Sequence, residues 1–109
     1  MRKLFFSGLF LAVLIAALAQ SGKITGKVIN AVSGQVLANA TITLIEKSKK
    51  EIADQNGNFT FSKLETGTYS IKCSYVGYEE KIIDEIVVKN NESSSITISL
   101  DEKKAVNQE

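Results

Sequence analysis

Apolar and polar residues alternate along most of the chain after residue 23, and Gly, Asn and Ser interrupt the alternation at short intervals. A period of two is typical of strands with one buried face, and Gly and Asn supply the positive φ angles of tight turns. No stretch after residue 20 shows the 3.6-residue period of a helix. The pattern predicts seven strands, at residues 24–30, 40–47, 51–54, 59–64, 68–76, 79–89 and 94–100.

The period of two also assigns each side chain to a face. The residues predicted to point into a common core are Ile24, Val28, Ala40, Ile42, Leu44, Phe59, Phe61, Tyr69, Ile71, Cys73, Tyr75, Ile96, Ile98 and Leu100. The segment 79–89 breaks the alternation, because it contains two pairs of adjacent apolar residues. Asp84 and Glu85 lie between these pairs and predict either a bulge or a corner where the strand changes face or sheet. We therefore expect an all-β fold, a seven-stranded antiparallel β-sandwich.

The clearest turn signal is the dipeptide Asn56-Gly57, between the third and fourth predicted strands. Both residues tolerate the positive φ angles of a tight primed turn, so we expect a hairpin here. Asp54 begins a run of side-chain oxygens that resembles half of a calcium loop, but Phe59 occupies the position where such a loop needs Gly. We therefore expect Asp54 to accept backbone N–H groups of the turn and not to bind a metal.

Residues 1–19 have the features of a secretory signal peptide. Two basic residues precede an apolar run over 4–18, and residues 17–19 form an A-x-A cleavage site. The run is shorter than the ~20 residues that span a bilayer, which argues against an uncleaved membrane anchor. We expect cleavage before Gln20 and export of the remaining chain.

The remaining chain is long enough for one small domain. Without the basic residues of the signal peptide it has 11 basic and 12 acidic residues, a net charge near −1. This balance argues against nucleic acid as a partner, because phosphate binding needs a clustered basic surface. Lys47, Lys49 and Lys50 are predicted to be solvated residues of a hairpin loop. Cys73 is the only cysteine and lies on an apolar strand face, so we expect it to be buried in a monomeric domain without a disulfide.

Catalytic chemistry has few candidates in this sequence. There is no His, and the neighbouring carboxylates of residues 79–80 and 84–85 would point to opposite faces of a strand. The sequence predicts no catalytic, cofactor-binding or metal-binding residue, and hence a protein that is not an enzyme. Glycan binding stays open as an alternative, although there is no Trp and Tyr78 is the one aromatic that could face outward.

Five short motifs occur in order over about 55 residues. They are Ile24-x-Gly26-x-Val28, Leu37-x-x-Ala40-x-Ile42-x-Leu44, Asp54-x-x-Gly57-x-Phe59, Leu64-x-x-Gly67-x-Tyr69 and Tyr75-x-Gly77-Tyr78. Together they resemble the carboxypeptidase regulatory-like domain, a prealbumin-like β-sandwich. The resemblance implies a domain over 23–100 after the signal peptide 1–19, followed by a polar tail or linker over 101–109.

The order of signal peptide and domain is similar to that of bacterial SusC-like TonB-dependent outer-membrane receptors, in which a plug domain and a membrane barrel come next. This resemblance implies a non-catalytic accessory or interaction module on the periplasmic side of the outer membrane. Its partner would be a protein, either the receptor plug or another periplasmic protein. The alternative is a free-standing periplasmic or secreted binding protein for a small molecule or glycan.

Overall fold

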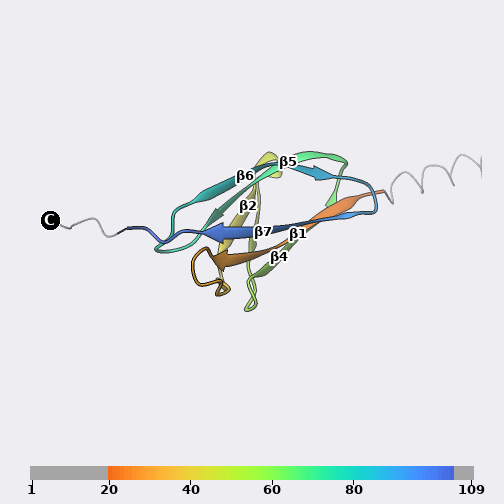
Figure 1. The fold of residues 1–109 in the computed structure, drawn as a ribbon. Helices are drawn as coiled ribbons and strands as arrows, with labels where there is room; N and C mark the ends of the chain where they lie inside the picture. The colour runs from red at the N-terminus through yellow and green to blue at the C-terminus, as the bar shows by residue number, and fades with distance from the viewer. Residues whose placement is uncertain (1–19, 105–109) are drawn as a thin grey trace, which may run out of the picture.

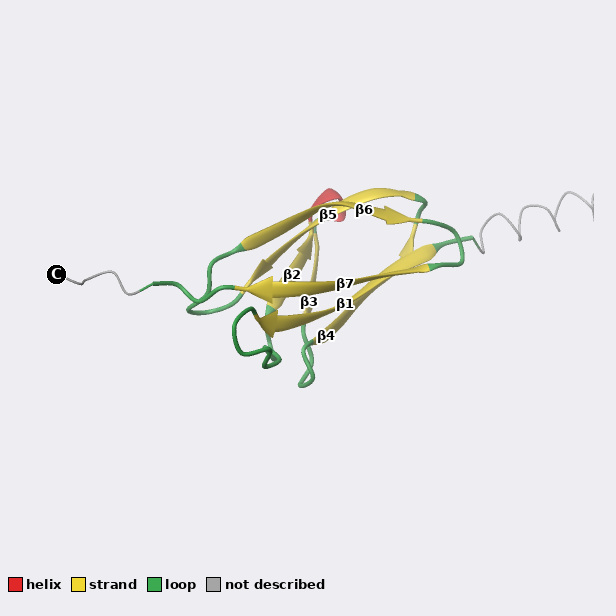
Figure 2. Cartoon of the chain, in the orientation of Figure 1, coloured by secondary structure: helices red, strands yellow, loops and turns green. Residues whose placement is uncertain are grey.

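The structure is a computed structural model that describes residues 20–104. The predicted signal peptide and residues 105–109 lie outside this part. The described chain forms seven strands and one 3-10 turn (Figure 2). They are β1 (Gly22–Asn30), β2 (Thr41–Leu44), η1 (Ile45–Lys47), β3 (Lys49–Ile52), β4 (Asn58–Leu64), β5 (Gly67–Ser74), β6 (Lys81–Val88) and β7 (Ser93–Leu100). Within residues 20–104, no helix has the length and hydrophobicity to cross a membrane.

The strands form two sheets, in the orders β4-β1-β7 and β3-β2-β5-β6, which pack face to face (Figure 1). This confirms the predicted seven-stranded β-sandwich. All pairs are antiparallel except β1 with β7, which run parallel from Lys23 opposite Ser93 to Asn30 opposite Leu100. The alternation of residues did not predict this pair, because it indicates the face of a side chain and not the direction of a neighbouring strand.

The inner faces of the two sheets meet in one apolar core. The predicted core is confirmed, since twelve of its residues are buried and Tyr75 and Ile96 are partly buried against them. Gly26 leaves space in this core for an aromatic ring, because a Cβ atom there would lie 2.3 Å from Cζ of Phe59. Phe59 in turn packs edge-on against Phe61, with ring centroids 6.0 Å apart. Cys73 is fully buried, as predicted.

The bulge predicted in the segment 79–89 is present in β6. Ile83 lies opposite Ile71 and Ile86 opposite Tyr69, so β6 uses one residue more than β5 over this interval. Glu85 has a φ of 58°, which accommodates the extra residue. Because of the bulge, Ile83 before it and Ile86 after it both point toward the core, although the two residues are three positions apart.

The third strand and the turn after it differ from the prediction. The strand predicted at 51–54 lies at Lys49–Ile52, so Lys49 and Lys50 belong to a strand and not to the predicted hairpin loop. The turn at Asn56-Gly57 forms, with the N–H of Gly57 donating to the carbonyl of Asp54 at 2.9 Å, but only Gly57 has a positive φ. The hairpin prediction was wrong, because β3 and β4 belong to different sheets and the turn carries the chain from one sheet to the other.

Candidate interaction surface

The largest polar network of the domain lies at the end of the sandwich where β1, β5 and β7 finish. Asn30 is its centre, with 7% of its surface exposed. Its Nδ2 donates to the hydroxyl of Tyr78 at 2.9 Å and to Oε2 of Glu102 at 3.0 Å. Its Oδ1 accepts from the backbone N–H groups of Val32 at 2.8 Å and Ser33 at 2.9 Å. Both donors and both acceptor sites of the amide are therefore used.

This network fixes the segment after β7. The N–H of Glu79 donates to the carbonyl of Asp101 at 2.8 Å, and the N–H of Lys103 donates to the carbonyl of Gly77 at 2.9 Å. Tyr78 and Glu102 form an antiparallel bridge between these two bonds. The first three residues of the polar tail, 101–103, thus pair with the β5–β6 loop.

Two apolar side chains stand out at the same end. Val32, in the loop after β1, and Val76, in the loop after β5, each expose 93% of their surface. Val32 also lines a shallow hollow together with three carboxylates and one ammonium group, those of Glu79, Asp101, Glu102 and Lys104. We call Val32, Val76 and this hollow the exit surface, because the described chain leaves the sandwich here.

Tyr78 does not serve as an open aromatic platform. Its ring is partly buried against the core, and its centroid lies 5.5 Å from that of Tyr75. Its hydroxyl accepts from Asn30. The expectation that this ring could face outward is corrected, and every other aromatic residue between 20 and 104 is buried or partly buried as well.

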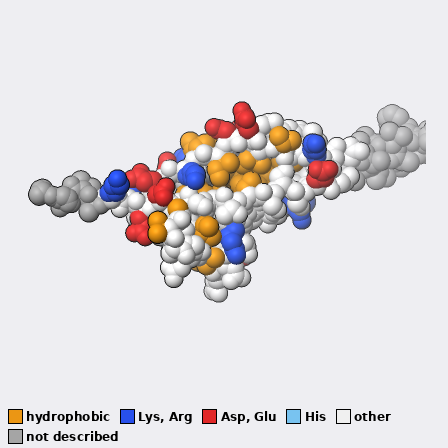
Figure 3. All heavy atoms as spheres, viewed as in Figure 1, with side chains coloured by type: hydrophobic (Ala, Val, Ile, Leu, Met, Phe, Trp, Pro, Cys, Tyr) orange, Lys and Arg blue, Asp and Glu red, His pale blue; other side chains and the backbone are white. Residues whose placement is uncertain are grey.

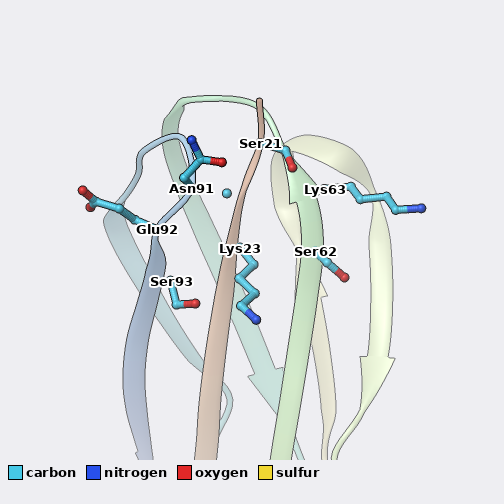
Figure 4. A pocket seen from close by; sticks show the side chains of 8 residues that line it. Ser21, Lys23, Ser62, Lys63, Asn91, Glu92 and Ser93 are labelled. Carbon is cyan, nitrogen blue, oxygen red and sulfur yellow. The ribbon is translucent and has the colours of Figure 1, made fainter. Parts of the chain in front are cut away.

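A second hollow lies at the opposite end of the sandwich, near the start of β1 (Figure 4). It is lined by Ser21, Gly22, Lys23, Ser62, Lys63, Asn91, Glu92 and Ser93. The side chains of Lys63 and Glu92 point to opposite sides of the hollow, and that of Ser62 points away from it (Figure 4). The polar groups do not converge on one point, so this hollow lacks the arrangement of a catalytic or binding site.

Among residues 20–104, two ionisable groups have shifted pKa values, and contacts within the fold account for both shifts. Burial raises the pKa of the Cys73 thiol to about 11, which disfavours the reactive thiolate. The N–H of Ser70 donates to Glu46 at 2.8 Å, and this bond lowers the pKa of that carboxyl group. Glu46 lies on η1, at a point where β2 has ended and no longer pairs with β5.

Other polar side chains considered in the sequence analysis are Asp54 and the carboxylates of the β6 bulge. Oδ1 of Asp54 accepts the N–H groups of Asn56 and Asn58, each at 2.9 Å, so the predicted turn motif is confirmed. Between residues 20 and 104, no three His, Cys, Asp or Glu side chains are arranged so that they could hold a metal ion. The carboxylates of Asp84 and Glu85 are exposed at the β6 bulge.

Comparison with known proteins agrees with the fold and the motifs. The model of the CarboxypepD_reg-like domain family matches residues 24–109. The chain belongs to this family. The resemblance carried by the five motifs is thereby confirmed. No curated protein matches the chain.

Solved structures with the same fold include a cohesin–X-dockerin complex, a minor pilin and a putative carbohydrate binding protein. The chain is similar to a chain of a type II cohesin–X-dockerin complex from Acetivibrio cellulolyticus, at 21% identity and a TM-score of 0.59, over 72% of this chain and 56% of that one. It is similar to the minor pilin GBS52 of Streptococcus agalactiae, at 14% identity and a TM-score of 0.62, over 83% and 48%. A putative carbohydrate binding protein from Bacteroides uniformis has 10% identity and a TM-score of 0.56, over 72% and 40%. The chain spans about half the length of these proteins, and at such identities the likeness extends to the fold alone.

Proposed function

We propose that this domain is a non-catalytic interaction module of an exported protein, and that it forms the N-terminal extension of a TonB-dependent outer-membrane receptor. Membership of the CarboxypepD_reg-like family and the signal-peptide pattern of residues 1–19 support the proposal. The observation that carries it is the exit surface, where the network of Asn30 and two main-chain bonds hold residues 101–103 against the sandwich.

The fixed exit of the chain restricts the position of a neighbouring domain. A segment that leaves a domain through a flexible tail takes many orientations, whereas hydrogen bonds at Gly77, Glu79 and Asn30 restrict the first residues here. The next folded part of the polypeptide would start beside Val32 and Val76. These two exposed side chains offer the apolar contact area that an interface between neighbouring domains uses.

The charges of the exit surface narrow the chemistry of the partner. Glu79, Asp101 and Glu102 contribute three carboxylates, and Lys104 contributes one ammonium group. A protein surface with a small apolar pocket and Lys or Arg at its rim complements this arrangement. In the receptor context that surface would belong to the plug domain or to a periplasmic partner.

The test identifies the polypeptide that carries the domain in the cell. An antibody raised against the domain is used on soluble periplasmic and outer-membrane fractions. A band much larger than 109 residues in the outer-membrane fraction supports the receptor extension. A band of the size of the exported chain alone, in the soluble fraction, overturns it in favour of a free-standing binding protein.

The exit surface itself is tested in the same cells by Val76→Glu, with the exposed Ile52→Glu on β3 as the matched control. Limited proteolysis of the outer-membrane fraction should cleave the Val76→Glu protein after residue 104 faster than either the parent or the control. Equal cleavage of all three proteins contradicts a docked neighbouring domain.

A further inference from the structure

The sandwich has four edge strands, and β7 is the one whose sequence is long, uncharged and regular. β3 has four residues, three of them charged. β6 carries the bulge at Glu85, and β4 has a positive φ of 58° at Lys63 near its end. β7 pairs with β1 in an unbroken register over eight residues, and its sequence Ser93–Leu100 contains no charge, no Pro and no positive φ. Uncharged, regular edges of this length are templates for another strand.

The free edge of β7 presents the backbone groups of its odd-numbered residues. The carbonyls of Glu92 and Leu100 accept N–H groups from Lys23 and Ala31, so the even-numbered residues bond toward β1. Successive carbonyls of a strand point to opposite sides. Ser99 agrees with this, because its carbonyl accepts a bond from β6 and not from β1. Ser95, Thr97 and Ser99 therefore direct their N–H and C=O groups outward.

The sequence of this edge is symmetric. Residues 95–99 read Ser-Ile-Thr-Ile-Ser, which is the same in both directions about Thr97. In an antiparallel pair of two such strands, Thr97 lies opposite its own copy, and Ser95 lies opposite Ser99 of the other strand. These are the residues with outward backbone groups, so each facing pair exchanges two N–H···O bonds. Only hydroxyl side chains meet on the outer face, without like charges.

We propose that β7 pairs with β7 of a second copy of this chain, antiparallel and centred on Thr97. The three-stranded sheets of the two copies then join into one sheet of six strands. A two-fold axis relates the two copies. This differs from the monomer expected from the sequence, because composition and periodicity do not indicate which strand edge is left open.

The apolar side chains beside β7 favour such a partner. Figure 3 shows hydrophobic side chains gathered on the face between β6 and β7. Ile83 of β6 and Ile96 of β7 are only partly buried, although both pack against the core. In the symmetric register, Ile98 of the second copy lies opposite Ile96. Pairing therefore extends the apolar inner face of the sheet beside the partly buried side chains between β6 and β7.

Two contacts of the chain itself lie on this edge and compete with the second strand. The N–H of Glu79 donates to the carbonyl of Asp101 at 2.8 Å, so pairing with the second copy is limited to residues 95–99. Nζ of Lys81 donates to the carbonyl of Ser99 at 3.0 Å in an exposed position. Pairing replaces this bond by one from the N–H of Ser95 of the other copy. The ammonium group then returns to water, where its charge is fully solvated, so the exchange opposes pairing only weakly.

A Thr97→Cys variant tests the register directly. Facing residues of a hydrogen-bonded antiparallel pair have Cα atoms about 5.5 Å apart, which lies within the range that a disulfide bridges. The full chain is purified in the form that the cell exports, and mild oxidation is followed by non-reducing electrophoresis. We expect a disulfide-linked dimer from Thr97→Cys. The matched control is Thr60→Cys, an exposed Thr on β4 of the same sheet, and it should stay mostly unlinked. Cys73 is buried and common to both proteins.

The second measurement is sedimentation equilibrium of the parent, Thr97→Lys and Thr60→Lys. Lys at residue 97 places two positive charges opposite each other at the two-fold axis, and we expect the dimer dissociation constant to rise at least about tenfold. Thr60→Lys adds the same charge away from the axis and should leave the constant unchanged. A parent that stays monomeric while Thr97→Cys links no faster than Thr60→Cys overturns the proposal. Linkage of Thr97→Cys to a different protein in place of its own copy overturns it as well.

Discussion

Asn30 connects three segments that are far apart in the sequence. Its side chain bonds the loop after β1, the loop after β5 and the segment after β7. No local signal in the sequence indicates this role, because an Asn at the end of a strand usually belongs to a turn. Only the long-range arrangement brings Tyr78 and Glu102 to its amide nitrogen.

Asn30→Ala should therefore destabilise the domain by about 1–3 kcal/mol, since partly buried donors and acceptors lose their partners. Urea unfolding followed by circular dichroism measures the change. Gln35→Ala, at an exposed position of the same loop, is the control and should stay within about 0.5 kcal/mol of the parent. Equal losses for the two variants would show that the network contributes nothing to stability.

Cys73 makes stability depend on pH. Burial raises the pKa of its thiol from 9.0 to about 11, so the unfolded chain loses the proton at a lower pH than the folded one. Between these values the folded state holds more protons, and stability falls as the pH rises. We expect the melting temperature of the parent to decrease between pH 9 and 11 more steeply than that of Cys73→Ala. Parallel curves for the two proteins would contradict a buried thiol.

At the scale of the elements, the local sequence pattern predicted the buried faces of the strands better than it predicted which strands pair. The period of two identified the buried faces, and the adjacent apolar pairs around Asp84 identified the bulge in β6. Strand β3 was displaced by two residues, because Asp54 serves the turn and not the strand. The parallel pairing of β1 with β7 joins segments about 70 residues apart, and no turn between them marks it. Contacts of that range depend on the whole fold.

The turn from β3 to β4 depends on one carboxylate oxygen. Asp54→Ala removes two hydrogen bonds to a charged acceptor, and we expect a loss of about 1–3 kcal/mol in the free energy of unfolding. Asp54→Asn keeps an acceptor at the same place and should lose clearly less. If both variants lost the same amount, the negative charge and not the bond geometry would hold the turn. Thermal unfolding of the three proteins under identical conditions makes the comparison.

At the scale of the whole molecule, the sequence predicted the fold and the family, and much less of the candidate site. Val32 and Val76 have no pattern that distinguishes them from core residues, and their exposure follows from the loops that carry them. The tail at 101–104 has a polar composition that suggests a linker, yet its backbone groups pair with the loop at Gly77. Composition describes side chains, whereas this contact is made mainly by the main chain.

A further prediction at this scale is that the protein is exported after cleavage of residues 1–19. The signal-peptide pattern predicts that the protein isolated from its natural source begins at Gln20. Intact-mass spectrometry measures this directly. Reversing the basic charges with Arg2→Glu and Lys3→Glu should impair export and cause the uncleaved form to accumulate. A natural protein that retains Met1 would show that residues 1–19 are not a cleaved signal.

The parallel arrangement of β1 and β7 also determines how the domain carries mechanical load. Because the two strands run in the same direction, the start of β1 and the end of β7 lie at opposite ends of the sandwich (Figure 1). A force that stretches the molecule between these ends slides one strand along the other. The bonds from Lys23 to Asn30 then share the load and must break together, whereas an antiparallel hairpin pulled at its open end breaks one bond after another. Stretching the domain between these ends therefore loads the β1–β7 bonds in shear.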